Sequence, residues 1–233
     1  MKPRVLFVPA DKKNDENFIK LLNSLRKFHD ERELPVIRYD LEDVTDPHKW
    51  YKAKPMIAQK LMDEYEVVIG ADADQIILGD ISHIWETKGD VAVVLNDPNY
   101  PINVWDIGPK FGSLYFNNGL VVMKSKEFVN HWLRLCNTPH FDRYQFREQD
   151  ILNLLCSDYF DYTVDCLDLS DKIHGELAKG LWAKAEVVDG KVMIEGKQLL
   201  VIHFGGGSGD PMKGNYRTRF QKDVVKYIDG AIK

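Results

Sequence analysis

The sequence has few cysteines, no long apolar run and no excess of positive charge. Its 3 cysteines, Cys136, Cys156 and Cys166, are odd in number and lack Cys-x-x-Cys spacing, so we expect neither a disulfide framework nor a zinc site, and a reducing, cytoplasmic location fits best. The first apolar run, residues 5–10, is too short for a signal peptide, and no run approaches the roughly 20 apolar residues of a membrane helix. With 36 acidic against 31 basic side chains, the net charge of −5 offers no general attraction to nucleic acid or to an anionic membrane. Small molecules are therefore the expected partners.

What is present is the composition of a globular domain. The chain has 233 residues, of which 44% are hydrophobic and 11% aromatic, enough for a sizeable core, and it contains no repeat or linker. We therefore expect residues 1–233 to form a single domain. Short apolar runs typical of buried strands alternate with segments of helical periodicity. This alternation predicts an α/β fold, with a Rossmann-like, mixed but mainly parallel sheet flanked by helices.

The expected elements follow this alternation. Strands are expected at residues 5–8, 34–39, 67–71, 91–95, 120–123 and 199–202. Helices are expected at residues 18–28, 54–65, 128–136, 147–156 and 216–228. Asp189-Gly190 between two apolar arms predicts a hairpin over residues 186–194, which we expect to make the later part of the sheet antiparallel. Residues 96–112, rich in Pro, Asn and Gly, predict a long loop of the kind that often lines a site.

Asp72 and Asp74 follow the apolar run at residues 67–71 and so lie where a buried strand ends. Open α/β sheets bind ligands at this edge. In extended chain, residues i and i+2 point to the same side, so both carboxylates can reach one hard cation, which in turn can hold a diphosphate. The spacing alone is weak evidence, because a polar turn that closes a strand has the same pattern. Further residues have to support a metal–diphosphate site.

His203 provides such support, because it ends the run at residues 199–202 and precedes the glycine-rich residues 205–209. Imidazole with two carboxylates suits Mn²⁺ or a related divalent ion better than Ca²⁺. The glycines would let backbone N–H groups approach phosphate oxygens closely. Taken alone, His203 is more simply explained as a strand-end histidine, and the glycines as a plain loop. Together with the aspartates they form complementary halves of a metal–phosphate cradle.

Four segments in order give the chain a resemblance to the family 8 glycosyltransferases, the group that includes glycogenin and bacterial galactosyltransferases. Residues 66–80, with Asp-Ala-Asp, resemble the family's metal-binding region. Residues 115–120 (Tyr-Phe-Asn-Asn-Gly-Leu) resemble its Phe-Asn-Ser-Gly segment, and residues 148–153 (Glu-Gln-Asp-Ile-Leu-Asn) its Asp-Gln-x-x-Leu-Asn segment. Residues 203–206 (His-Phe-Gly-Gly) resemble its His-Phe-x-Gly loop. The resemblance covers nearly the whole chain, and four ordered motifs are more specific than any one.

The resemblance implies a GT-A fold and transfer of a hexose from a UDP-sugar, UDP-glucose or UDP-galactose, with retention at the anomeric carbon. It implies that Asp72, Asp74 and His203 hold Mn²⁺ or Mg²⁺ and that Ala73 contacts the donor, the metal neutralising the UDP leaving group. The acceptor, a carbohydrate or another hydroxyl compound, is not readable from the sequence. A homodimer is left open.

The resemblance also assigns the residues around the donor sugar. Asn117 and Gln149 match positions that face this sugar, where amides can hydrogen-bond its hydroxyls. Glu148 stands where the family commonly has Asp and completes the expected catalytic set. Lys54 resembles the family lysine that contacts the donor, with a solvated helix lysine as the alternative.

Both ends of the expected donor site depart from the family pattern. Val8 and Ala10 are assigned to the base, although the aromatic residue often found just after the first strand is absent. Gly205 and Gly206 are assigned to the phosphates. Lys213 would replace a phosphate-binding lysine, because this chain has Asp-Pro-Met-Lys where the family loop ends in Lys-Pro-Trp.

Two other functions share part of the pattern. A haloacid-dehalogenase-type phosphatase also uses Asp-x-Asp with Mg²⁺, but its motif lies at the first strand and has Thr or Val where this chain has Ile76. A non-catalytic nucleotide-sugar-binding protein would account for the departures at Glu148 and Lys213. Donor turnover separates an enzyme from such a binding protein.

Overall fold

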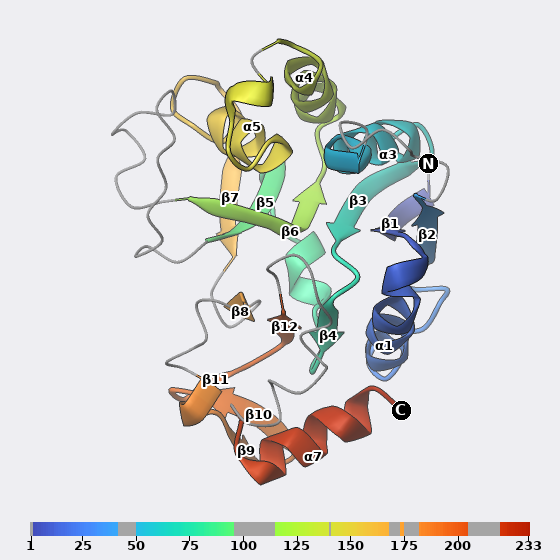
Figure 1. Cartoon of the computed structure of the whole chain (residues 1–233), viewed down its shortest axis with the longest axis vertical. Helices are drawn as coiled ribbons and strands as arrows, with labels where there is room; N and C mark the ends of the chain where they lie inside the picture. Colours follow the sequence, from blue (N-terminus) through green and yellow to red (C-terminus); the bar gives the residue numbers. More distant parts are fainter. Residues whose placement is uncertain are drawn as a thin grey trace.

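The computed structural model describes residues 2–41, 50–95, 115–139, 141–167, 173–174, 182–204 and 220–233. Its centre is a six-stranded sheet of order β2-β1-β3-β6-β5-β7 (Figure 1). The strands are β1 (Lys2–Ala10), β2 (Val36–Asp40), β3 (Tyr65–Ala71), β5 (Val91–Leu95), β6 (Phe116–Met123) and β7 (Val164–Leu167). β1 pairs in parallel with β2 and β3, and β5 with β7, whereas β6 runs antiparallel to β3 and β5. The sheet is mixed and mainly parallel, as the sequence predicts.

Helices cover both faces of this sheet (Figure 1). One face carries α3 (Ala53–Leu61), α4 (Lys126–Cys136) and α5 (Glu148–Leu155), and the other α1 (Asp15–Leu25). Alternation along β1 makes this possible, since Val5 and Phe7 pack toward α3 and α4 while Leu6 and Val8 pack toward α1. Both layers are therefore anchored by the same strands, which fixes the strand ends that carry the candidate site.

Two small sheets lie beyond the central one. β9 (Glu186–Val188), β10 (Lys191–Ile194) and β11 (Lys197–Gln198) form one, and β4 (Gln75–Ile77), β12 (Val201–His203) and β8 (Ile173–His174) form the other. The hairpin β9–β10 turns at Asp189 and Gly190, both with positive φ (49° and 72°), as a type I′ turn requires. The expectation that this hairpin belongs to the main sheet is wrong. Its apolar side chains pack instead against α7 (Lys222–Ala231) in a separate core, and β6 is the antiparallel strand of the main sheet.

The last predicted strand also pairs in an unexpected place. β12 lies antiparallel to β4, the short strand that follows Asp74, with His203 opposite Gln75. The backbone N–H of Phe204 donates to the Asp74 carbonyl at 3.1 Å. This pairing brings residues 72–74 and residue 203 together, although about 130 positions separate them in the chain.

Several element ends differ from the predictions. α1 ends at Leu25, and Phe28 lies in the following turn with 37% of its surface exposed. α3 ends at Leu61 because a turn intervenes before Tyr65, which starts β3 rather than ending the helix. Within the described ranges, no helix is long and apolar enough to span a membrane. The predicted loop at 96–112 and the start of the predicted last helix lie outside the described residues.

Candidate active site

Asp72 follows β3 directly, and its position is fixed by the neighbouring strand β6. Its backbone N–H donates to the Gly119 carbonyl at 2.8 Å. The same carbonyl accepts a hydrogen bond of 2.5 Å from Nε2 of the buried Gln75. Residues 73 and 74 then form a turn into β4. The segment that carries both aspartates is therefore fixed to the β6 backbone by these two hydrogen bonds.

His203 meets both carboxylates from the end of β12. Its Nε2 lies 3.3 Å from Asp72 Oδ2 and 3.1 Å from Asp74 Oδ1. One potential ligand atom from each of the three residues falls within 4.8 Å of the others. His203 is only 3% exposed, whereas the aspartate side chains are 35% and 26% exposed, so the cluster opens to solvent on the carboxylate side. Two carboxylates and one imidazole are a fitting ligand set for Mn²⁺ or a similar divalent ion.

Because Gly119 has no side chain, the His203 imidazole can pack directly against the β6 backbone. A Cβ at position 119 would lie 2.8 Å from His203 Nδ1 and closer still to Cε1. It would also lie 2.8 Å from Oδ1 of Asn117. These separations are shorter than van der Waals contact, so the backbone of β6 can approach the imidazole only because residue 119 has no side chain.

Gly119→Ala is therefore expected to displace His203 from the carboxylates. We expect at least a tenfold loss of Mn²⁺ affinity, because residues that orient a ligand typically contribute 10–100-fold, and a loss of about 1–3 kcal/mol in the free energy of unfolding from overpacking. Isothermal titration with Mn²⁺ and urea unfolding measure the two effects. Gly230→Ala is the matched control, since its Cβ would have nothing within 4 Å. Unchanged Mn²⁺ affinity in Gly119→Ala would remove His203 from the metal site.

Lys54 reaches the cluster from α3. Its side chain is only 8% exposed, and Nζ lies 2.5 Å from Asp72 Oδ1 and 2.6 Å from the Asn118 carbonyl, to which it donates. The alternative of a solvated helix lysine is therefore wrong. Burial opposes ionisation of Asp72, but the Lys54 ammonium outweighs it and His203 adds to this effect, so the pKa of Asp72 lies well below its ordinary range. Asp72 is thus kept in the ionised form that a metal ligand requires.

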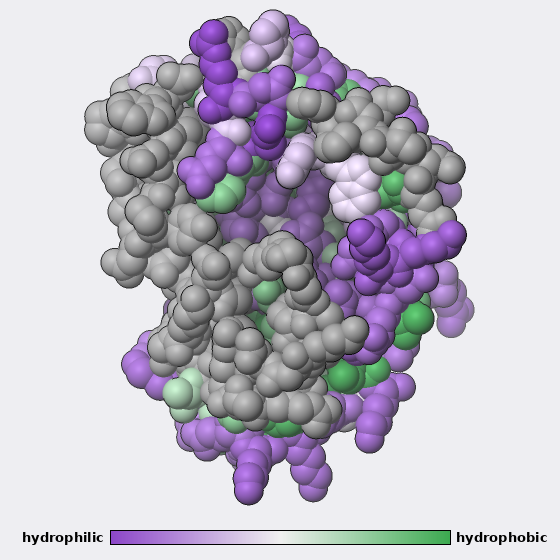
Figure 2. Space-filling view, in the orientation of Figure 1, coloured by the Kyte–Doolittle hydropathy of each residue, from purple (hydrophilic) through white to green (hydrophobic). Residues whose placement is uncertain are grey.

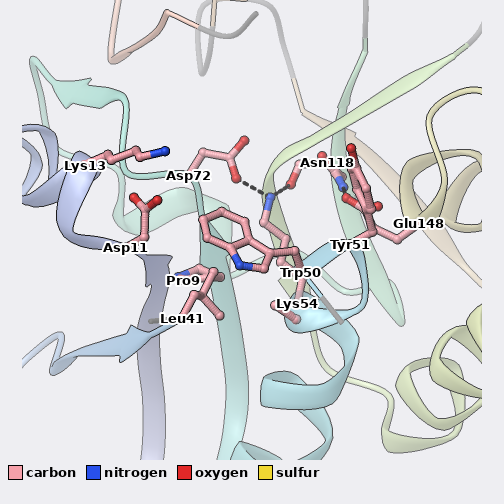
Figure 3. A pocket seen from close by; sticks show the side chains of 11 residues that line it. Pro9, Asp11, Lys13, Leu41, Trp50, Tyr51, Lys54, Asp72, Asn118 and Glu148 are labelled. Atoms are coloured by element: carbon pink, nitrogen blue, oxygen red, sulfur yellow. Dashed lines mark hydrogen bonds and ion pairs between the residues drawn. The ribbon is translucent and has the colours of Figure 1, made fainter. Parts of the chain in front are cut away.

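Beside this cluster lies a cavity of about 540 Å³. Figure 2 shows a hollow with hydrophilic residues in its depth, and Figure 3 shows the lining of the cavity from close by. The lining residues are Pro9, Asp11, Lys13, Leu41, Trp50, Tyr51, Ala53, Lys54, Asp72, Asn118 and Glu148. Asp72 belongs both to the Asp-Asp-His cluster and to the cavity wall, so a cation held by the cluster would lie at the edge of the cavity. The volume is in the range of small-molecule sites.

A hydrogen-bonded network joins the start of β6 to the start of α5. Oε1 of Gln149 accepts from the Asn118 backbone N–H at 3.0 Å and from Nδ2 of Asn117 at 3.4 Å. Nε2 of Gln149 donates to the Tyr115 hydroxyl at 3.1 Å, and that hydroxyl donates to Asp150. The predicted amides Asn117 and Gln149 are thus brought together and held in fixed orientations.

Glu148 has one carboxylate oxygen bound and one available. Its Oε1 accepts from Nδ2 of Asn118 at 3.0 Å, while its buried Oε2 has no hydrogen-bond partner within the described part of the chain. Burial raises the pKa of Glu148 to about 7, against the opposing effects of the Lys54 ammonium, of the residue's own backbone N–H and of the Asn118 amide. A buried carboxyl oxygen that faces a cavity and lacks a partner is suited to hydrogen-bond a ligand, as an acceptor when ionised and as a donor when protonated.

This raised pKa has a consequence for stability. The folded protein keeps the Glu148 proton up to about pH 7, whereas the unfolded chain loses it near the ordinary value of 4.5. The stabilisation is complete below pH 4.5 and is lost as the pH rises through 7. We expect Glu148→Gln to be more stable than the wild type by on the order of 2 kcal/mol above pH 7 and to gain little at pH 4.5. Urea unfolding in EDTA across this range measures the difference, and a constant difference would contradict the raised pKa.

Of the remaining predicted site residues, three are buried in the core and three lie outside the described residues. Val8 and Ala10 are buried in the core beside α1, and they do not line the cavity, whereas their neighbours Pro9 and Asp11 do. Ala73 is buried in the same core. Gly205, Gly206 and Lys213 lie outside the described residues.

Several contributors to the site were not predicted from the sequence, among them Asn118, Trp50 and Tyr51. Asn118 hydrogen-bonds Glu148, Gln149 and Lys54, and although it lies in the family-like segment 115–120, the sequence assigned it no role. Trp50 and Tyr51 line the cavity from the chain just before α3. Their place three to four residues before Lys54 puts them about one helical turn from it, which would have indicated the same surface.

The fold is similar to the folds of several solved glycosyltransferases. The chain superposes on the galactosyltransferase LgtC, solved with donor and acceptor sugar analogs, with a TM-score of 0.67 and 14% identity, covering 97% of this chain and 95% of that one. A glycosyltransferase involved in glycosylating the major capsid of PBCV-1 gives 0.60 and 12%, covering 99% and 100%. The glycosyltransferase GlyE of Streptococcus pneumoniae TIGR4 gives 0.62 and 12%, covering 99% of this chain and 63% of that one. No family model and no curated protein matches the sequence.

These similarities establish the fold. The mixed, mainly parallel sheet with helices on both faces is the GT-A fold of the glycosyltransferases that it superposes on. The predicted GT-A fold is thereby confirmed, whereas membership of family 8 stays a prediction. At 12–14% identity, the activity of these proteins does not transfer by similarity alone.

Proposed function

We propose that the protein is a metal-dependent glycosyltransferase that transfers a hexose from a UDP-sugar, UDP-glucose or UDP-galactose, to a hydroxyl acceptor with retention of configuration. The observation that carries this proposal is the Asp72, Asp74 and His203 cluster at the edge of a 540 Å³ cavity. The order of the four sequence motifs and the GT-A fold support it. Membership of family 8 and a cytoplasmic location are part of the same proposal.

The cluster would hold Mn²⁺ or Mg²⁺. A divalent ion there supplies Lewis-acid neutralisation of the two phosphates of the leaving UDP. Lys54, whose ammonium lies between Asp72 and the Asn118 carbonyl, adds a second positive charge on the cavity wall. This ammonium is paired with Asp72, so it contributes to the charge balance that a diphosphate would meet, and its burial keeps solvent screening of that charge small.

The amide and carboxyl groups at the start of α5 would bind the donor sugar. Glu148 offers to a sugar hydroxyl its Oε2, which has no partner among the described residues, and Asn117 and Gln149 are held at the same end by their mutual hydrogen bond. A site built to hydrogen-bond a hydroxyl discriminates strongly against sugars that lack it. In the reaction, the bond from the anomeric carbon to UDP breaks, a bond to the acceptor oxygen forms, and the proton of the acceptor hydroxyl passes to the departing UDP phosphate.

Release of UDP tests this proposal against the two alternatives. The protein is incubated with UDP-glucose or UDP-galactose and Mn²⁺, and UDP and inorganic phosphate are assayed separately. Slow, Mn²⁺-dependent release of UDP without phosphate, with water as the acceptor, is expected. Release of phosphate from simple phosphomonoesters, with no turnover of UDP-sugars, would instead show a phosphatase. Binding of UDP without turnover of any donor would show a non-catalytic binding protein.

A further inference from the structure

The cavity extends from Lys54 and Asp72 to a side lined by Pro9, Asp11 and Leu41, and the contact for a nucleobase on this side has to be identified (Figure 3). The first strand leads into Asp11, Lys12 and Lys13, so the chain has no aromatic residue there. Val8 and Ala10, the positions assigned to the base, are turned into the core. If the protein binds a nucleotide as proposed above, another element has to provide the surface on which the base rests.

The ends of β1 and β3 define where this surface must be. β1 lies between β2 and β3, and the chain leaves β1 toward one neighbour and later returns on its other side, so the crevice between their carboxyl ends is a topological switch point. Figure 3 shows Asp11, Pro9 and Leu41 on one side of the cavity and Asn118 and Glu148 on the other, with Lys54 and Asp72 between. A diphosphate joins the sugar at one end to the nucleoside at the other. With the sugar at Glu148, the base lies on the side of Pro9 and Leu41.

Trp50 presents an aromatic ring to this side. The indole extends toward Pro9 in the same cavity wall (Figure 3). Trp50 is 37% exposed, which is a high value for the largest apolar side chain. The large apolar side chains exposed in the described residues are Ile19, Phe28, Trp50, Tyr51, Tyr159 and Val188. Only two of them, Trp50 and Tyr51, line the cavity.

Of these two aromatic residues, Trp50 is the one with its ring available. The guanidinium of Arg147 lies 5.6 Å from the centre of the Tyr51 ring and covers it by a cation–π contact. For Trp50, the described part of the chain provides no aromatic or cationic partner of this kind. An indole that is partly exposed inside a cavity and has no ring partner is suited to stack on a planar ligand.

We propose that Trp50 stacks on the nucleobase of the donor, taking the place of the aromatic residue that is missing after the first strand. Pro9 and Leu41 form the apolar surroundings of the base on the same side. This inference rests on the proposed function, because it requires a nucleoside diphosphate whose phosphates lie at Lys54 and the metal cluster. It assigns the stacking contact to Trp50, just before α3, rather than to a side chain that follows β1.

The test compares UDP with pyrophosphate, which has the phosphates but no base. Calorimetric titrations in Mn²⁺ are made on the wild type, Trp50→Leu, Trp50→Phe and Phe28→Leu. Phe28 is the matched control, since it is equally exposed at 37% and does not line the cavity. In Trp50→Leu we expect UDP affinity to fall about tenfold, within the range measured for base–aromatic stacking, and pyrophosphate affinity to stay unchanged. Trp50→Phe retains most of the UDP affinity, and Phe28→Leu retains all of it.

The outcomes separate this inference from the function on which it rests. A wild type that binds neither UDP nor pyrophosphate in Mn²⁺ overturns both. A wild type that binds UDP, with Trp50→Leu binding it equally well, overturns the role of Trp50 alone. An equal loss of UDP and pyrophosphate affinity in Trp50→Leu also overturns it, because stacking on a base cannot weaken a ligand that has none. Circular dichroism of each variant confirms that it is folded.

Discussion

Asp74→Asn is expected to reduce Mn²⁺-dependent UDP affinity by on the order of 100-fold or more, because it removes one charged ligand of three, and even residues that only orient a ligand contribute 10–100-fold. Asp74 is the better choice of the two aspartates. Asp72 also pairs with the buried Lys54 ammonium. Removing the Asp72 carboxylate would leave that ammonium unpaired and destabilise the fold, so a loss of UDP affinity could not be assigned to the metal site alone. The Asp74 carboxylate contacts His203 at 3.1 Å and is one-quarter exposed, so an isosteric amide should leave the fold intact.

Calorimetric titration of UDP in Mn²⁺ measures this loss, and thermal unfolding in EDTA checks the fold. Asp189→Asn is the control, since Asp189 lies in the exposed turn of the β9–β10 hairpin, where asparagine tolerates the positive φ of 49°. An Asp74→Asn protein that binds UDP as tightly as the wild type would remove the carboxylate pair from the site.

Lys54→Met is expected to destabilise the metal-free protein and to make Mn²⁺ a stronger stabiliser. The substitution leaves Asp72 without the ammonium 2.5 Å away and leaves the Asn118 carbonyl without its donor. Breaking a fully buried pair costs about 3–5 kcal/mol. Because the Asp72 side chain is 35% exposed, we expect a smaller loss, about 1–3 kcal/mol in the free energy of unfolding. A divalent ion on Asp72 would replace the missing positive charge.

Thermal unfolding with and without Mn²⁺ measures both effects, and the rise in Tm on adding Mn²⁺ should be larger in Lys54→Met than in the wild type. Lys60→Met is the control on the same helix, because Lys60 is exposed and its ammonium contacts Tyr39 on the edge strand β2 rather than the Asp-Asp-His cluster. Equal stability of Lys54→Met and Lys60→Met would show that the buried ion pair does not matter to the fold. An equal Mn²⁺ effect in both would separate Lys54 from the metal cluster.

The sequence predicts the parts of this site that local patterns encode. An apolar run that ends in Asp72 and Asp74, and another that ends in His203, indicate strand ends, and the structure has β3 and β12 there. The alternation of strands and helices predicts the central sheet and its helical layers. These features depend on neighbours in the chain, so a single sequence carries them.

Features that depend on long-range pairing could not be predicted in this way. The antiparallel match of β12 with β4 brings His203 to Asp74, yet β4 has only three residues and no distinctive pattern of its own. The hairpin signal at Asp189-Gly190 predicts a local turn but does not indicate which sheet the hairpin joins. Lys54 has the sequence context of a surface lysine, and only the meeting of α3 with β3 and β6 shows that it is buried.

The most direct test of the central claim is a calorimetric titration of UDP into the protein in Mn²⁺ and again in EDTA, because it needs no knowledge of the acceptor. The Asp72, Asp74 and His203 cluster predicts binding in Mn²⁺ and its loss in EDTA, restored when excess Mn²⁺ is added. Binding of equal strength in EDTA, or no binding in either condition, would contradict a metal-held nucleoside diphosphate at this site.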